Sequence, residues 1–181
     1  MLPEPPGDRV PRDHGASFAV RSALPADMRS VRRLVEPYAE RRILLAKEMV
    51  GYYEAVQEFL VAADVDGGVV GCGALHVMWD DLAEVRTLAA DPAWRGRGVG
   101  HAIVEGLVER ARRLGLRRVF CLTFEVGFFR THGFREIDGT PVDAEVYAEL
   151  LRSHDDGVAE FLDLARVKPN TLGNTRMLLE L

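Results

Sequence analysis

The segment Arg95-Gly96-Arg97-Gly98-Val99-Gly100 holds three glycines and two arginines within six residues. We expect it to join a strand to a long helix, whose first turn has free N–H groups and the positive end of the helix dipole. Glycines let a phosphate approach the backbone closely, and arginines add positive charge. The segment therefore predicts a pyrophosphate site, with an ordinary glycine-rich connection as the alternative.

Other kinds of chemistry find no matching pattern in the chain. The glycine spacing is GxGxG, whereas a dinucleotide site needs GxGxxG early in a βαβ unit, so NAD binding is disfavoured. There is neither a GxSxG nucleophile elbow nor a GxxxxGK[ST] phosphate loop. The five histidines are scattered, and Cys72 and Cys121 form no CxxC pair. We therefore predict no metal site.

Composition limits the class of protein. The chain has 181 residues, 48% of them hydrophobic, and a net charge of -5. This acidic balance argues against a nucleic-acid binder, which usually carries a basic face. No apolar run approaches the roughly 18 residues of a membrane span, and no signal peptide is visible. Because both cysteines fall in apolar runs, we expect buried free thiols in a reducing, cytoplasmic protein.

Hydrophobic periodicity predicts one domain of mixed strands and helices over residues 17–181, preceded by a proline-rich, disordered tail over residues 1–16. Three consecutive strands should form an antiparallel meander that ends at Asp91-Pro92, just before the glycine-rich segment. The predicted strands are 18–23, 59–63, 69–78, 84–90, 118–123, one after Phe134, and 176–181. The predicted helices are one opened by Pro25, then 47–56, 98–114, a short helix or turn at 124–132, 143–153 and 157–163.

The pattern Arg95-x-x-Gly98-x-Gly100, after a meander and before an amphipathic helix, resembles the pyrophosphate motif of the GCN5-related N-acetyltransferase (GNAT) superfamily. The following strand, short helix and Gly133-Phe134 resemble the family's usual ending, so the resemblance covers residues 18–138. It implies an α+β fold with a mostly antiparallel twisted sheet, splayed between strands 4 and 5 and flanked by helices. It also implies acetyl-CoA as co-substrate. The resemblance assigns CoA contacts to residues of strand 4, the loop and the short helix: Leu88, Ala89, Ala90, Arg95, Gly96, Arg97, Gly98, Val99, Gly100 and Phe129.

The same resemblance nominates a catalytic base. Glu84 lies on the strand that precedes the glycine-rich segment, eleven residues before Arg95. A glutamate at this offset is the base in the histone-acetylating branch. A base is needed because an amine attacks only when neutral. The alternative is a solvent-facing strand glutamate. Residues 124–130 contain no tyrosine where many members place their acid, so water or the released thiolate must serve.

Several short strings resemble bacterial N-acetylglutamate synthases of the short, actinobacterial form that lacks the amino-acid-kinase domain. Residues 71–75 resemble their GCAAL strand, Ile43-Leu44-Leu45 followed by Lys47 their IL-plus-basic segment, and Asn174-Thr175-Arg176 their C-terminal NSK. Leu122-Thr123 matches the start of their LTT, with Phe124 in place of the second threonine. The resemblance implies that L-glutamate is acetylated by direct attack in a ternary complex, the first step of arginine synthesis.

The chemistry of glutamate nominates its own contacts. Its two carboxylates require at least two fixed cations, for which Lys47, Arg86 and Arg176 are candidates. Arg86 shares a strand face with Glu84, because the two are two residues apart. Each of these cations could equally be a solvated surface charge. Further predicted substrate contacts are Cys72, Thr123, Lys168 and Thr175.

Three other interpretations stay open. L-glutamine differs from glutamate only in its distal group and could be the acceptor. Another amine, such as a polyamine or a protein N-terminus, is possible, although a polyamine site should be lined by acids. A CoA-binding sensor without chemistry would explain the glycine-rich loop but not Glu84. The resemblance implies small molecules as partners, and a homodimer only as a family-level expectation.

Overall fold

A computed structural model describes residues 17–45, 47–167 and 173–181; the predicted tail over 1–16 and Lys168 lie outside this part. All seven strands belong to one sheet with the order β1-β2-β3-β4-β5-β7-β6. The strands are β1 (Phe18–Ser22), β2 (Phe59–Asp64), β3 (Val69–Val77), β4 (Leu82–Ala90), β5 (Arg118–Thr123), β6 (Arg135–Glu136) and β7 (Thr175–Glu180). The α-helices are α1 (Met28–Glu40), α2 (Met49–Glu54), α3 (Val99–Arg113), α4 (Val126–Arg130), α5 (Ala144–Leu150) and α6 (Asp156–Phe161).

The sheet opens between its two central strands. Strands β2 to β4 form the predicted antiparallel meander, and β1 pairs antiparallel with β2 at its outer edge. Strand β4 pairs with β5 in parallel, and the pairing covers only residues 82–84 against 118–120. Beyond Glu84 the strands separate, and a register shift between Cys72 and Ala74 bends β4 where Thr87 adopts φ 57°. The predicted fold, a mostly antiparallel sheet splayed between strands 4 and 5, is confirmed.

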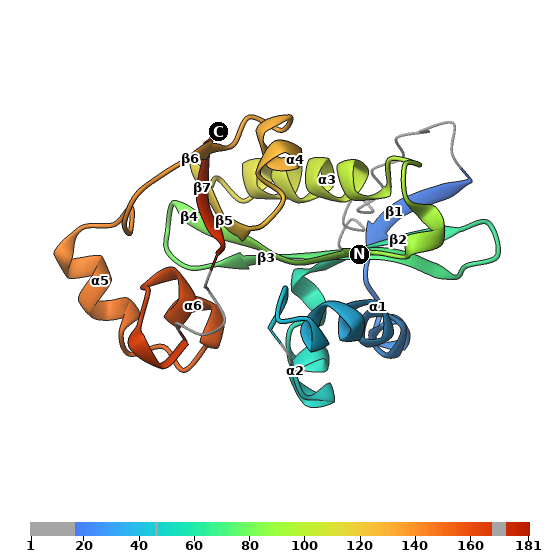
Figure 1. Cartoon of the computed structure of the whole chain (residues 1–181), viewed down its shortest axis with the longest axis horizontal. Coiled ribbons are helices and arrows are strands. Elements are labelled where there is room, and N and C mark those ends of the chain that lie inside the picture. Colours follow the sequence, from blue (N-terminus) through green and yellow to red (C-terminus); the bar gives the residue numbers. More distant parts are fainter. Residues whose placement is uncertain (1–16, 46, 168–172) are drawn as a thin grey trace, which may run out of the picture.

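Helices cover both faces of the sheet (Figure 1): α3 and α4 lie on one face, and α1, α2, α5 and α6 lie on the other. Helix α3 approaches β3 closely because two strand glycines leave it room. A Cβ at Gly71 would collide with Val99 and lie 2.9 Å from Ile103, and one at Gly73 would lie 2.8 Å from Ile103. These glycines therefore place the start of α3, and the loop before it, against the sheet.

Two separate apolar clusters hold the helices of the other face. Helices α1 and α2 pack on β2 to β4 through a cluster that includes Met28, Val31 and Tyr52. Helices α5 and α6 pack over β5 and β7, where Phe161 meets Phe120 edge to face at 4.9 Å. Figure 1 shows the two helix groups side by side on this face, with a seam between them.

Element boundaries differ from the predictions for local reasons. Strand β4 begins two residues earlier than expected, at Leu82. The helix predicted over 47–56 is shorter, and a 3-10 turn at Val56–Glu58 follows it. Asp143 and Asp155 cap α5 and α6, which end earlier than predicted. Within the described residues, no helix is both long and apolar enough to cross a membrane.

Candidate active site

The glycine-rich loop has the backbone of an anion cradle. Gly96 and Gly98 adopt φ 77° and 81°, which L side chains rarely reach, and nothing lies within 4 Å of a Cβ built on either. Gly98 is the N-cap of α3, so the free N–H groups of the first turn face open space. Gly100 has less space than these two glycines, because a Cβ built on it would lie 3.4 Å from the Phe128 ring. Arg97 lies over the Trp94 ring at 4.8 Å.

A cleft of about 800 Å³ runs from this cradle along the gap between β4 and β5. One wall is the bulged strand β4, and the other is the end of β5 with α4. Its lining includes most of the predicted CoA contacts: Leu88, Ala89, Ala90, Arg95, Gly96, Gly98, Val99, Gly100 and Phe129. Strand β4 has no ladder partner on this side beyond Glu84, so its backbone can bond a ligand there.

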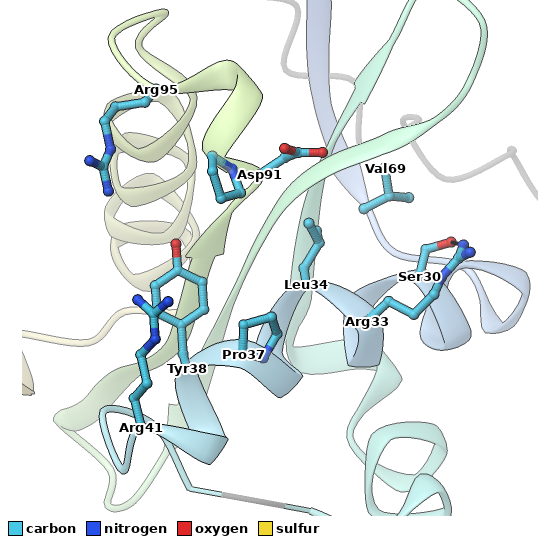
Figure 2. Close-up of a pocket in the computed structure, with 10 residues that line it drawn as sticks. Ser30, Arg33, Leu34, Pro37, Tyr38, Arg41, Val69, Asp91 and Arg95 are labelled. Atoms are coloured by element: carbon cyan, nitrogen blue, oxygen red, sulfur yellow. Dashed lines mark hydrogen bonds between the residues drawn. The ribbon is translucent and has the colours of Figure 1, made fainter.

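A third wall comes from α1. The Tyr38 hydroxyl donates to the Ala90 carbonyl across 3.1 Å, which ties α1 to the end of β4. A side cavity of about 410 Å³ opens here. Figure 2 shows Arg41 and Arg95 on the same side as Tyr38, whereas Arg33 lies with Ser30 on the far side. Arg41, the residue that follows α1, thus lines this side cavity together with Arg95 of the loop.

These features fit a CoA molecule. A doubly charged pyrophosphate matches the open first turn of α3, with Arg95 beside it. An extended arm that carries amides matches the unpaired edge of β4, which offers backbone groups along its length. Both features lie in one continuous cleft, so a single long ligand can use them together.

A second cavity, of about 280 Å³, adjoins the cleft where the strands separate. Its walls come from β4, from the connector between α1 and α2, and from α6. It shares six lining residues with the cleft, which are Ile43, Leu44, Val85, Arg86, Thr87 and Leu122. A thioester at the end of the long cleft would therefore meet a molecule bound in the smaller cavity.

Glu84 lies on the wall of the smaller cavity and is only 3% exposed. The solvent-facing alternative is therefore excluded. Burial raises the pKa of this carboxyl to about 8, an effect that the nearby positive charge of Arg86 reduces but does not cancel. Among the described residues, none donates a hydrogen bond to Glu84 Oε2. A buried acceptor without a donor is costly, so this oxygen is suited to meet a donor from a ligand.

Arg86 faces the same cavity, as its spacing from Glu84 predicted, but its guanidinium already has protein partners. Nη1 donates to Asp155 across 2.6 Å and lies 3.8 Å from Glu84, while Nη2 contacts Asp155 at 3.2 Å and Glu58 at 3.4 Å. Burial opposes its charge, yet these carboxylates hold the pKa of Arg86 above its ordinary value. Arg86 thus joins α6 to β4 beside Glu84. It also lines the cavity, and its buried Nε has no hydrogen-bond partner among the described residues, so its contact with substrate stays a prediction.

Lys47 is a second predicted cation of the cavity. It lies on the connector between α1 and α2 and lines the cavity. Burial, followed by repulsion from Arg86, lowers the pKa of its amine. Arg42 lines the same cavity from the same connector. One wall thus carries two cations, and the others carry the carboxyls of Glu84 and Glu160.

Three other predicted substrate contacts occupy different positions. Cys72 is fully buried among the α1 and α2 side chains, and burial raises the pKa of its thiol to about 12, so it cannot line the cavity. Arg176 donates to the backbone carbonyls of Gly139, Glu160 and Phe161 and thereby holds α6. Thr175 pairs with Thr123 between β7 and β5.

Thr123 is the exception, because it lines the CoA cleft, where its hydroxyl accepts from the Glu125 amide across 2.8 Å. Sequence reasoning also missed several residues that line one of the two cavities. Tyr38 was assigned only to the core face of a helix. Asn174 belongs to the NSK-like string but was given no contact, and His101 lies on the predicted helix α3. The others carry no motif; they are Arg42, Glu125, Asp156, Gly157 and Glu160.

Residues 26–134 match the family described as the Acetyltransferase (GNAT) family. The chain belongs to the GNAT family. This match spans the meander, the glycine-rich loop and the Gly133-Phe134 ending, so the resemblance drawn from those motifs is confirmed. The chain is an acyltransferase of this fold.

Two similar proteins match this GNAT enzyme over nearly their whole length. An amino-acid acetyltransferase of Mycobacterium tuberculosis is 61% identical over 164 residues, which are 90% of this chain and 94% of that protein. A solved M. tuberculosis structure, in complex with CoA and NLQ, superposes with a TM-score of 0.88 at 61% identity, covering 90% of this chain and 99% of that one. The predicted co-substrate, acetyl-CoA, agrees with this CoA complex.

More distant relatives are longer than this GNAT enzyme. The amino-acid acetyltransferase of Aeromonas salmonicida is 31% identical over 129 residues, 69% of this chain but 29% of that protein. The N-acetylglutamate synthase of Neisseria gonorrhoeae, solved with coenzyme A and N-acetyl-glutamate, superposes with a TM-score of 0.72 at 22% identity. That superposition covers 92% of this chain and 35% of the synthase, and it shows a shared fold.

Proposed function

We propose that this protein transfers the acetyl group of acetyl-CoA to the α-amino group of L-glutamate, giving N-acetyl-L-glutamate and CoA. The observation that carries the proposal is Glu84, whose buried Oε2 has no donor in the described part of the chain and faces a cavity beside the CoA cleft. An ammonium group is the donor that a carboxylate there would bind best. A relative of similar length and a much longer one are both named amino-acid acetyltransferases, which supports an amino acid as the acceptor.

The charges of the cavity match an amino-acid zwitterion. Glu84 lines it from β4, and Lys47 and Arg42 line it from the connector. An ammonium placed at Glu84 leaves the carboxylates to these two cations. A polyamine has no group for Lys47 and Arg42, so the cavity disfavours that alternative.

In the proposed reaction Glu84 takes one proton from the bound ammonium. Its pKa of about 8 suits this step, because the ionised form is accessible near neutral pH and is basic enough to accept a proton. The neutral amine then attacks the thioester carbonyl carbon, and the C–S bond breaks. Backbone amides of β4 beyond the bulge would stabilise the oxyanion. Arg86, fixed by its bonds to Asp155 and Glu58, lies 3.8 Å from Glu84 and favours its ionised form.

A substrate screen tests the proposal. The purified protein would be incubated with acetyl-CoA and each common amino acid, and free CoA thiol would be measured against a blank without acceptor. We expect the highest kcat/KM with L-glutamate. Release of CoA with L-glutamine but not with L-glutamate would show that glutamine is the acceptor of the same acetyl transfer. Binding of acetyl-CoA without CoA release in the presence of either amino acid would overturn the proposal in favour of a sensor.

A further inference from the structure

Glu160 is a carboxyl of the acceptor cavity to which neither the family's motifs nor the reaction above gives a role. It comes from α6, in the C-terminal extension, and lines the cavity together with Glu84 of β4. The two carboxyls are close enough that the charge of Glu160 raises the pKa of Glu84. The cavity thus has two carboxyls that reach it from separate elements.

The position of Glu160 is held by contacts on every side of α6. Asp155, the N-cap of the helix, accepts from the Val158 amide and binds Arg86. Phe161 is fully buried against Phe120, and Arg176 donates to the carbonyl of Glu160 itself. These contacts fix the helix relative to β4 and β7.

Gly157 sets the distance between α6 and Glu84. A Cβ at this position would collide with the Arg86 guanidinium and lie 3.3 Å from Glu84 Oε2. The absence of a side chain therefore lets α6 lie directly against the strand that carries the base. Such a close approach is what two carboxyls need in order to share one bound cation.

The overall reaction removes two protons from the substrate nitrogen. The nitrogen of an ammonium carries three hydrogens and the product amide carries one, so two N–H bonds must break. One proton ends on the sulfur of CoA and the other is released. With one base, Glu84 would have to release the first proton before it accepts the second. A second acceptor removes that requirement, and residues 124–130 provide no tyrosine to protonate the thiolate.

We propose that Glu160 is a second catalytic carboxyl: it binds the substrate's ammonium group together with Glu84 and accepts the second proton. This inference rests on the proposed function. Glu84 takes the first proton, which makes the amine neutral. After the nitrogen–carbon bond forms, the second N–H bond breaks and an O–H bond forms on Glu160. As the C–S bond breaks, one of the two protons passes to the thiolate and the other leaves to solvent.

The electrostatics of the cavity agree with this role. Burial, then the charge of Asp156, raises the pKa of Glu160 to about 7, with a further contribution from Asp155 and an opposing one from Arg86. Lys47 and Arg42 of the connector and Glu84 of β4 line the same cavity, and Arg176 of β7 donates to the Glu160 carbonyl. Two carboxyls that titrate near neutral pH can exchange protons with an amine at little cost.

Glu160→Gln tests the proposal through kinetics. We expect the KM for the amino acid to rise about 10-fold or more and kcat to fall by a similar factor, with acetyl-CoA binding unchanged. The acid limb of kcat/KM should also move to lower pH, because loss of the neighbouring negative charge lowers the pKa of Glu84. Glu145→Gln, on the exposed part of α5, is the matched control and should behave as wild type. An unchanged KM and acid limb, or equal losses in the control, would overturn the proposal.

A titration without substrate keeps this test separate from the proposed function. In protein labelled with ¹³C at glutamate carboxyls, the wild type should show two coupled transitions above pH 6 that Glu160→Gln reduces to one at lower pH. If Glu160→Gln left the glutamate carboxyl titrations unchanged, the proposed pairing of Glu84 with Glu160 would be overturned, even with an active wild-type enzyme. An inactive wild type with the coupled titration would overturn only the proposed acceptor.

Discussion

Glu84 is an acid whose surroundings favour its neutral form, and this determines how it can act. It lies 3% exposed at the last residue where β4 and β5 still pair. Water cannot solvate its charge there, and Arg86 offsets only part of that loss, so its pKa rises to about 8. An arriving ammonium group would supply the missing counter-charge and ionise it. Substrate binding and base activation are thus the same event at this residue.

Replacing Glu84 by Gln keeps the shape of the side chain and removes the base. We expect kcat at pH 7 to fall by about 100- to 10,000-fold, the usual contribution of general-base catalysis. In the wild type kcat/KM should rise with pH through the ionisation of Glu84, and the variant should lack this limb. Steady-state kinetics from pH 6 to 9.5 measure both. Equal activity of variant and wild type at every pH would show that Glu84 is not the base.

At the scale of elements, the position of α3 decides whether the glycine-rich loop can hold a pyrophosphate. Helix α3 packs against β3 over two glycines, and its first residue, Val99, lies against Gly71. The loop itself needs positive φ at Gly96 and Gly98. The cradle is therefore made by two sets of glycines, one that shapes the loop and one in a strand that lets the helix approach.

Gly71→Ala should push α3 away from the sheet. Its new Cβ would overlap Val99 and Ile103, and such overpacking costs about 1–3 kcal/mol of unfolding free energy. Acetyl-CoA binding should weaken as well, because the displaced residues begin the helix that carries the cradle. Urea denaturation and calorimetric titration measure the two effects. Gly127→Ala is the control: it is exposed on α4 with nothing within 4 Å of its Cβ, and it should be neutral or slightly stabilising.

At the scale of the whole molecule, two carboxyls between the two helix groups, Asp155 and Glu84, change stability with pH in opposite directions. Asp155 is held ionised by Arg86, which outweighs its burial, so its pKa falls to about 2. The stability it contributes is present above the ordinary pKa of 3.8 and is lost only as pH falls through 2. Glu84 acts in the other direction. Its pKa is 4.5 when unperturbed and about 8 in the fold, so the folded state binds more protons between these values.

The stability contribution of Glu84 is therefore present below pH 4.5 and is lost as pH rises through 8. Glu84→Gln removes this dependence, so the variant should melt at the same temperature as the wild type near pH 4.5 and several degrees higher at pH 8.5. Thermal unfolding at matched ionic strength over this range measures the difference. A gap that is constant with pH would mean that Glu84 keeps its ordinary pKa in the fold.

The sequence by itself determined the family, the meander and the cradle, because each depends on near neighbours in the chain. The motif Arg95-x-x-Gly98-x-Gly100 joins a strand to a helix within a few residues, and strand alternation places Glu84 and Arg86 on one face. Local spacing is enough to predict such features. The family resemblance nominated Glu84 as the base through its offset from the loop, and this role stays a prediction.

Only the tertiary structure decided which charges remain available to a ligand. Arg86 has partners 28 and 69 residues away, at Glu58 and Asp155, and Arg176 reaches back to α6. Glu160 enters the cavity only because α6 packs on Phe120 and lies against β4 at Gly157. Charge pairing depends on distances between segments far apart in the chain, and residue type and local spacing carry no information about those distances.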